Sequence, residues 1–259
     1  MKLAFENLSL TLRNREILKN VTGEFPTGKM TVILGANGAG KSSLLSCLAG
    51  LRQPQSGTVL LGDRSLGDWT DNERARKLGL LPQKADIHWN VDVRTVVGLG
   101  RLPHRGRWGL SDRDRSAIEE ALRTTDCIDI ADRHAQRLSG GEQSRVLLAR
   151  VFAGEPDWLL ADEPLASLDP AHQFDILHQL RAYTEQGAGV ITVLHDITLA
   201  ARFADEVLIM KDGTILAQGP AGDILTPENL ATAYGVEIES LHTDTGESVL
   251  VPVSRLSAS

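Results

Sequence analysis

The sequence predicts an α/β fold built on a parallel sheet, and two features carry that prediction. The first is alternation: short apolar runs that read as buried strands are separated by stretches with apolar residues at helical spacing, and the runs lie at 30–34, 157–161 and 189–195. Strands buried on both faces, with helices between them, are typical of parallel sheets. The second is a glycine-rich loop between the first of these strands and a helix.

The elements around this framework follow from local patterns. Alternating or apolar runs at 3–12, 17–25 and 57–62 make the first quarter of the chain rich in predicted strands. Ser111 and Asp114 have the spacing of a capping box, and a helical reading runs from there to about Leu138. Further elements are helices at 142–154 and 170–186, a hairpin turning at Asp212-Gly213, and a tail from about Thr226 with a short helix and two weak strands.

The glycine-rich loop has the pattern of a phosphate site. Residues 33–43 read ILGANGAGKSS, which contains G-x-x-x-x-G-K-[ST]. Glycine lets backbone N–H groups curve around an anion, and the N-terminus of the following helix adds a positive dipole. Lys41 supplies a charge for the outer phosphates, and the Ser42 hydroxyl suits a magnesium shell. Because a strand precedes the loop and a helix follows it, the sequence predicts a nucleotide site here.

Two acidic residues follow the apolar run at 157–161. Asp162 is suited to hold magnesium through water, and Glu163 to orient or deprotonate an attacking water. Without a phosphate loop, the same pair would read as acidic residues capping a strand before a proline turn. With the loop, the pair predicts hydrolysis of a nucleoside triphosphate.

A second glycine pair lies just before the helix at 142–154. Ser139, Gly140 and Gly141, followed by Glu142, form an anion-binding nest at a helix N-terminus. The alternative is an ordinary helix start with Ser139 as its cap. The chain has one nucleotide loop for such a nest to serve, so we favour a role in nucleotide binding.

The phosphate loop, the Asp162-Glu163 pair and the LSGGE segment (138–142) together resemble the ATP-binding subunits of ABC transporters, over about residues 3–236. The resemblance implies a P-loop NTPase core, a RecA-like mixed sheet with helices, plus an antiparallel β subdomain and an α-helical subdomain that carries LSGGE. It implies a nucleotide-binding domain at 2–236, with its helical subdomain at about 84–156, and a C-terminal tail at 237–259. ATP and Mg²⁺ are the implied cofactors.

The resemblance also assigns roles to single residues. Glu163 is the implied base, His195 holds the γ-phosphate, and Gln83 senses that phosphate through the metal. Two copies bind head to tail, with Asp169 at their interface, so that each ATP lies between the loop of one copy and LSGGE of the other. The implied metal ligands are Ser42, Gln83 and Asp162. The implied ATP contacts are Gly35, Ala36, Asn37, Gly38, Ala39, Gly40, Lys41, Ser42, Ser43, Ser139, Gly140, Gly141, Glu142 and Asp169.

One position departs from the family pattern. Relatives carry an aromatic residue upstream of the loop that stacks on adenine, and the stretch LTLRNRE (10–16) has none. Either Leu12 packs on the base, or the Arg13 guanidinium stacks on it.

Three segments, at 98–109, 169–181 and 193–236, resemble the subunits that energise iron-siderophore, haem and cobalamin importers. Six arginines lie between Arg94 and Arg115. We expect Arg101 and Arg105 to belong to an exposed surface that binds a transmembrane permease, with Trp89 or Trp108 as an anchor. The alternative is a solvated basic face. A substrate-binding protein would be an indirect partner.

The composition of the chain excludes several other functional classes. The chain has 259 residues, a net charge of −7, two distant cysteines and no apolar run of membrane-spanning length. The acidic balance argues against a nucleic-acid partner and so against a soluble ABC ATPase acting on nucleic acid or the ribosome. LSGGE argues against a P-loop kinase or GTPase. We therefore expect a peripheral protein on the cytoplasmic side of the inner membrane, attached only through its permease.

Overall fold

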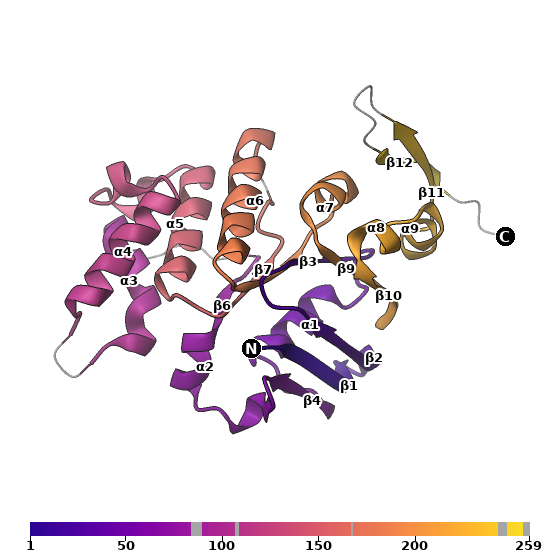
Figure 1. The fold of residues 1–259 in the computed structure, drawn as a ribbon, viewed down its shortest axis with the longest axis horizontal. Coiled ribbons are helices and arrows are strands. Elements are labelled where there is room, and N and C mark those ends of the chain that lie inside the picture. The colour runs from indigo at the N-terminus through magenta and orange to yellow at the C-terminus, as the bar shows by residue number, and fades with distance from the viewer. Residues whose placement is uncertain (84–89, 107–108, 167, 243–247, 256–259) are drawn as a thin grey trace. The chain divides into compact units, whose positions relative to one another are not determined.

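The chain folds into two compact units. The computed structural model describes residues 1–83, 90–106, 109–166, 168–242 and 248–255 (Figure 1). The first unit consists of Met1–Asp68 and Ile191–Ser259, and the second of Trp69–Val190. The boundary crosses the buried strand β8 (Gly189–Val193), so that this strand contributes to both units.

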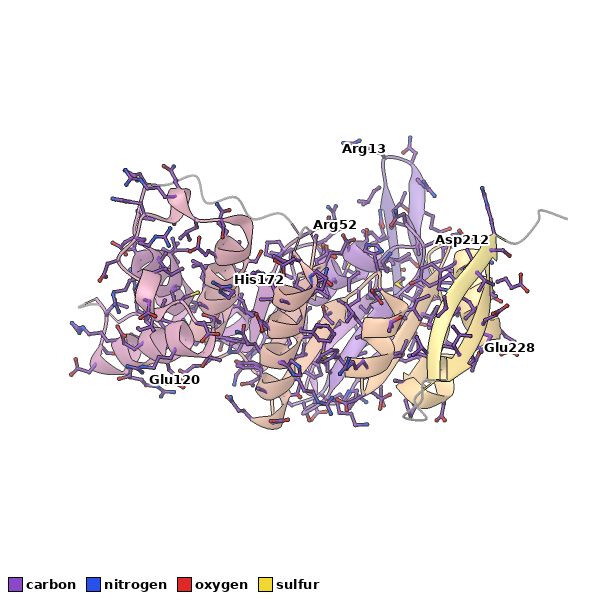
Figure 2. The ribbon with its side chains drawn as sticks, turned by 90° about the horizontal axis from the view of Figure 1, so that it is seen from above. Arg13, Arg52, Glu120, His172, Asp212 and Glu228 are labelled. Carbon is purple, nitrogen blue, oxygen red and sulfur yellow. The ribbon has the colours of Figure 1, made fainter. Side chains whose placement is uncertain are left out.

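An antiparallel sheet forms the start of the first unit. Its strand order is β2-β1-β4-β5, with β1 at Leu3–Leu12, β2 at Arg15–Phe25, β4 at Ser56–Leu61 and β5 at Arg64–Ser65. The rings of Phe5 and Phe25 stack on its buried face with their centroids 5.7 Å apart. The turn between β1 and β2 is formed by Arg13 and Asn14, both in the left-handed region, and Figure 2 shows Arg13 at its tip, pointing outward.

The other strands of the first unit support the phosphate loop. Strand β3 (Met30–Leu34) is buried at all five positions and runs parallel to β9 (Glu206–Lys211), which pairs antiparallel with β10 (Thr214–Pro220). The predicted hairpin turn at Asp212-Gly213 is confirmed, and both residues have positive φ, as a type I′ turn requires. The remaining elements are η1 (Leu66–Asp68), α1 (Lys41–Leu48), α7 (Ile197–Phe203), α8 (Ala221–Ile224), α9 (Pro227–Tyr234), β11 (Val236–His242) and β12 (Ser248–Arg255).

The second unit is mainly helical. Its strands β6 (Leu78–Leu81) and β7 (Trp158–Asp162) are parallel. Three of its helices, α3 (Val93–Gly98), α4 (Asp112–Thr124) and α5 (Gly140–Ala153), pack against one another (Figure 1). Position 189 requires glycine, because a Cβ there would lie 2.3 Å from the buried ring of Trp158. The helices are α2 (Asp71–Lys77), α3 (Val93–Gly98), η2 (Leu99–His104), α4 (Asp112–Thr124), η3 (Ile128–Ile130), η4 (Ala135–Arg137), α5 (Gly140–Ala153) and α6 (Pro170–Glu185).

The helix predicted from Ser111 begins as expected and ends early. The hydroxyl of Ser111 accepts from Asp114 N–H, and the Asp114 carboxylate accepts from Ser111 N–H, which completes the capping box. The helix stops at Thr124 because Asp126 adopts a left-handed conformation, with φ of 52°. The chain then reaches Leu138 through the short turns η3 and η4 rather than through one continuous helix.

The expectation that Arg101 is part of an exposed basic surface is wrong. Its side chain is 2% exposed, and its guanidinium pairs with Asp114 and Glu155, each at 2.8 Å, and donates to the Ala153 carbonyl. Arg101 therefore ties η2 to the start of α4 and to the end of α5. Trp89 and Trp108, the proposed anchors, lie outside the described residues.

The described helices include none that is long and apolar enough to cross a membrane.

Candidate functional site

The phosphate loop has the backbone that its sequence predicts. Gly35, Gly38 and Gly40 have φ of 145°, 83° and 104°, which glycine adopts without a steric cost. A Cβ on Gly35 would lie 2.2 Å from the Met210 carbonyl oxygen, so β9 packs directly against the start of the loop. The loop leads into α1, whose first N–H groups have no intrahelical partner and point towards the loop.

Lys41 lies within this loop rather than out in solvent. Its side chain is buried, and its ammonium donates to the carbonyl oxygens of Gly35 at 2.7 Å and Ala36 at 3.1 Å. A cation held over the loop is suited to bind the outer phosphates of a nucleotide.

Tyr234, at the end of α9, holds the first glycine of the loop. The Gly35 N–H donates to the Tyr234 hydroxyl at 3.0 Å, and Gly35 is buried. Burial raises the pKa of the Tyr234 phenol, which keeps the group neutral. Sequence reasoning missed this residue because 199 positions separate it from the loop and no local pattern links the two.

His195 follows β8 in the first unit. The N–H of Leu194 donates to the Ile33 carbonyl at 3.3 Å, which brings the end of β8 beside the end of β3. His195 is exposed at this end of the two strands, where β3 leads into the phosphate loop. Ligands bind at the carboxyl ends of strands in open α/β sheets, which agrees with the predicted role.

Gln83 and Glu163 meet in the second unit. The side-chain amide of Gln83 donates a hydrogen bond to the carboxylate of Glu163. Glu163 directly follows Asp162, the last residue of β7. Glu163 has φ of 51°, in the left-handed region that a non-glycine residue rarely adopts. Such backbone strain clusters at functional sites, where it fixes the direction of a side chain.

The LSGGE segment forms the start of α5. Ser139 is exposed and caps the helix: its hydroxyl accepts from Glu142 N–H at 3.3 Å, and the Glu142 carboxylate accepts from Ser139 N–H at 2.8 Å. These hydrogen bonds and the Arg133 guanidinium, 2.8 Å away, hold the pKa of Glu142 below its usual value. Ser139 therefore caps α5, as the alternative interpretation of this segment predicts. The N-terminus of α5 is nevertheless exposed and remains suited to bind an anion.

His172 lies between Asp169 and the LSGGE segment. Asp169 caps α6, and its carboxylate accepts from His172 N–H at 3.0 Å and contacts His172 Nδ1 at 2.8 Å. The His172 backbone N–H lowers the pKa of Asp169 most, and its ring adds to the effect. A Cβ on Gly141 would lie 3.6 Å from the His172 ring, whose position is labelled in Figure 2.

The predicted residues thus divide between the units. The first unit holds the loop (35–43), His195 and Leu12, which is half-buried at the end of β1. The second holds Gln83, Asp162, Glu163, Asp169 and the LSGGE segment.

Comparisons with known proteins place the chain in a family. Residues 18–166 match the family described as ABC transporter. The hemin import ATP-binding protein HmuV of Pseudomonas aeruginosa is 41% identical over 256 residues, which cover 96% of this chain and 99% of that protein. The protein of the same name from Rhodococcus jostii is 40% identical over 251 residues, which cover 96% of this chain and 86% of that protein.

Solved structures agree. An inward-facing ABC transporter described as of the metal-chelate type has a TM-score of 0.84 at 25% identity, covering 97% of both chains. A dimeric ATP-binding cassette in a post-hydrolysis state, bound to ADP and Pi, has a TM-score of 0.74 at 28% identity, covering 85% of this chain and 98% of that one. The α/β fold with its antiparallel and helical parts is therefore confirmed. The chain belongs to the ABC transporter family.

Proposed function

We propose that this chain is the ATP-hydrolysing subunit of an ABC importer whose cargo is haem. The observation that carries the proposal is the strained Glu163, held by Gln83 at the end of β7, in a chain that also folds a complete phosphate loop around Lys41. A phosphate loop alone serves many activities, whereas a carboxylate fixed after the strand is what hydrolysis adds.

Each group has a role in the proposed hydrolysis of ATP. The loop N–H groups and Lys41 bind the phosphates and stabilise the charge that develops on them. Glu163 accepts a proton from the attacking water, and Gln83 keeps the carboxylate directed at it. His195 donates to the γ-phosphate, which helps to hold it in line with the water.

Mg²⁺ fits the donors that the chain provides. Among the described residues there is no group of three or more His, Cys, Asp or Glu side chains able to cage a metal ion. Magnesium at phosphate sites needs no such cage, since it is bound through one or two carboxylates at most and completes its shell with other oxygens, water and phosphate. The Ser42 hydroxyl, the Asp162 carboxylate and the amide oxygen of Gln83 are oxygen donors of that kind. The ion would supply charge neutralisation on the phosphates.

We propose that two copies share each ATP. The exposed start of α5 at Ser139, and Asp169 joined to it through His172, would meet the nucleotide held by the loop of the other copy. The dimeric cassette among the structural relatives supports this arrangement. Subunits of this family act with permeases, and the permease would attach this chain to the cytoplasmic face of the membrane.

An ATP-binding subunit does not contact the cargo, so its residues do not identify the cargo. The proposed cargo is therefore taken from the names of the relatives. Two relatives at 40% and 41% identity are named as hemin import proteins. Ferric siderophores and cobalamin are the cargoes of related importers and serve as the competing outcomes.

The test is transport in a reconstituted system. The chain and the permease encoded beside it are placed in lipid vesicles, and ATP-dependent accumulation of haem, a ferric siderophore and cobalamin is measured with the matching binding protein. We expect haem to accumulate with the natural chain and not with Lys41→Ala. Accumulation of another cargo without haem would refute the assignment of cargo, and ATPase activity indifferent to any permease would refute the importer.

A further inference from the structure

A cavity of about 320 Å³ lies within the second unit, between α3 and α4 and beside the chain that joins them. The two helices pack against each other and lie side by side in Figure 1. The described residues that line the cavity include three arginines and one glutamate: Arg94 of α3, Arg105 of the joining chain, and Arg115 and Glu119 of α4. Of these lining residues, none is one that we assign to ATP, so ATP hydrolysis does not account for the cavity.

Local contacts hold the two helices that form the cavity. A Cβ on Gly98, the last residue of α3, would lie 3.4 Å from Cδ1 of Ile118, so α3 and α4 approach closely there. Ile118 is buried and, with Leu110, forms an apolar part of the lining. At its other end α3 is capped by Asp92, whose carboxylate accepts from Thr95 N–H at 2.7 Å. The walls of the cavity are therefore packed and capped helices.

The arginine of α3 has acidic partners within the protein. Arg94 donates a hydrogen bond to the carboxylate of Glu119, and its Nε lies 3.5 Å from the carboxylate of Asp132. The negative charge of Glu119 is thereby matched by Arg94. Glu119 consequently does not compensate the other two arginines of the lining.

Arg105 and Arg115 give the cavity a positive charge that is not compensated. Arg105 is exposed, and no acidic side chain among the described residues pairs with it. Arg115 contacts Asp112 at 3.4 Å, but both side chains are largely exposed, and exposed pairs of this kind contribute little. The Arg115 guanidinium also donates to the Leu110 carbonyl at 3.2 Å, which holds it beside the joining chain. Two guanidiniums that line one cavity repel each other unless an anion lies between them.

We propose that this cavity binds a phosphate group through Arg105 and Arg115. A guanidinium presents its N–H groups in a planar fork that forms two parallel hydrogen bonds with a phosphate. Phosphate oxygens are arranged tetrahedrally, so two forks reach them from different directions, whereas both oxygens of a carboxylate lie in one plane. Ile118 and Leu110 offer apolar contact to the carbon atoms next to the phosphate. Arg105 thus receives a phosphate partner instead of the permease that the sequence led us to expect.

Two sources present this same chemical group. One is a soluble phosphate ester. The other is the headgroup of an anionic phospholipid, which the proposed place of the chain beside a permease brings within reach. The inference goes beyond the proposed function, because neither ATP hydrolysis nor the choice of cargo depends on this cavity.

Calorimetry and vesicle binding test the site and separate the two sources. The phosphate loop is first saturated with a non-hydrolysable ATP analogue and Mg²⁺, so that the probes do not enter it. Glycerol phosphate, the soluble probe, is titrated into the full chain, and acetate is titrated as the carboxylate for comparison. Flotation then measures binding to vesicles of phosphatidylcholine with and without phosphatidylglycerol.

Three double variants complete the design. Arg105→Gln with Arg115→Gln removes both guanidiniums from the cavity. Arg113→Gln with Arg123→Gln is the matched control, because it removes the same charge from exposed side chains of α4 that do not line the cavity. Arg105→Lys with Arg115→Lys keeps the charge and loses the planar forks. Thermal melting shows that each variant folds.

We expect the natural chain to bind glycerol phosphate, the vesicles with phosphatidylglycerol, or both, and the probe that binds identifies the source. The glutamine variant should weaken that binding about tenfold or more, and the lysine variant several-fold. The matched control should bind as the natural chain does. ATPase activity of the isolated chain should be unchanged in all three variants.

Failure of the natural chain to bind either probe would overturn the inference. Equal weakening in the matched control, or full binding by the lysine variant, would also overturn it, since the attraction would then be one of general charge. Acetate that binds as tightly as glycerol phosphate would overturn the assignment to phosphate. Each of these results leaves the proposed function intact, because ATPase activity and transport are measured separately.

Discussion

The side-chain amide of Gln83 donates a hydrogen bond to the carboxylate of Glu163, although 80 positions separate the two residues in the sequence. Glu163 also has a left-handed backbone, which sets the direction in which its side chain leaves the end of β7. The bond and the backbone together restrict one carboxylate to a narrow range of positions. A general base needs such a restriction, because proton transfer depends on its distance from the water.

Arg101 should be essential for stability. Replacement by glutamine leaves Asp114 buried without its cation, and breaking a buried pair in this way costs about 3–5 kcal/mol. The free energy of unfolding, measured with urea, should fall by that amount. Arg105→Gln is the matched control, since Arg105 is exposed and should change stability by no more than about 0.5 kcal/mol. Equal effects of the two variants would contradict the buried network.

The same network should give stability a defined pH dependence. Hydrogen bonds from Ser111 and the Arg101 guanidinium hold the pKa of Asp114 well below its usual range. A carboxyl with a lowered pKa in the folded state stabilises the protein above its ordinary pKa, and this contribution is lost as pH falls through the folded value. The difference in unfolding free energy between the natural chain and Asp114→Asn should thus be full above about pH 5 and shrink below about pH 4.

Urea unfolding between pH 7 and pH 3 measures this difference. Asp112→Asn, on an exposed residue of the same helix turn, provides the control and should have little effect at any pH. A difference for Asp114→Asn that stays constant down to pH 3 would show that the carboxylate charge contributes nothing.

Much of the fold was predictable because its signals are local. The glycine conformations at 35, 38 and 40 follow from the loop pattern, the turn at Asp212-Gly213 from its dipeptide, and the start of α4 from the Ser111 capping box. Each depends on residues a few positions apart, where backbone sterics and local hydrogen bonds decide the structure.

The predictions that were wrong or missing concern positions whose structure the local sequence pattern does not determine. Arg101 was predicted to lie on an exposed surface that binds a permease, but Asp114 and Glu155 pair with its guanidinium and make its burial possible. Helical periodicity beyond Thr124 did not show that Asp126 would turn left-handed. No local pattern marks Tyr234 or His172 as a site residue, because their contacts with Gly35 and Asp169 depend on tertiary and capping geometry.

Tyr234 should affect nucleotide binding as well as stability. Tyr234→Phe leaves the buried N–H of Gly35 without its partner, a loss of about 1–3 kcal/mol, and loosens the start of the phosphate loop. The dissociation constant for ATP should rise several-fold. Tyr183→Phe is the matched control, because it removes a hydrogen bond to the Pro156 carbonyl in the second unit.

Unfolding free energies and ATP dissociation constants of both tyrosine variants decide the question. Both should be less stable, and only Tyr234→Phe should bind ATP more weakly. Unchanged ATP binding by Tyr234→Phe would reduce the contact with Gly35 to a purely structural one.

The shared ATP site predicts complementation between two inactive chains. Ser139→Arg damages the LSGGE segment, and Lys41→Ala damages the phosphate loop. In a mixed dimer both lesions fall in one site, and the other site is intact. ATPase activity should therefore reappear when the two variants are mixed, although each alone is inactive. Heterodimers that are shown to form and stay inactive would mean that each chain completes its own site.

The central claim, that Glu163 is the base for ATP hydrolysis, is tested most directly by Glu163→Gln. ATP binding and ATPase rate are measured on the same sample, beside Glu120→Gln as a control on an exposed glutamate. The account predicts that Glu163→Gln binds ATP as the natural chain does and loses about 100-fold or more of its turnover, while Glu120→Gln retains both. A Glu163→Gln chain that kept half of the natural turnover would contradict the account.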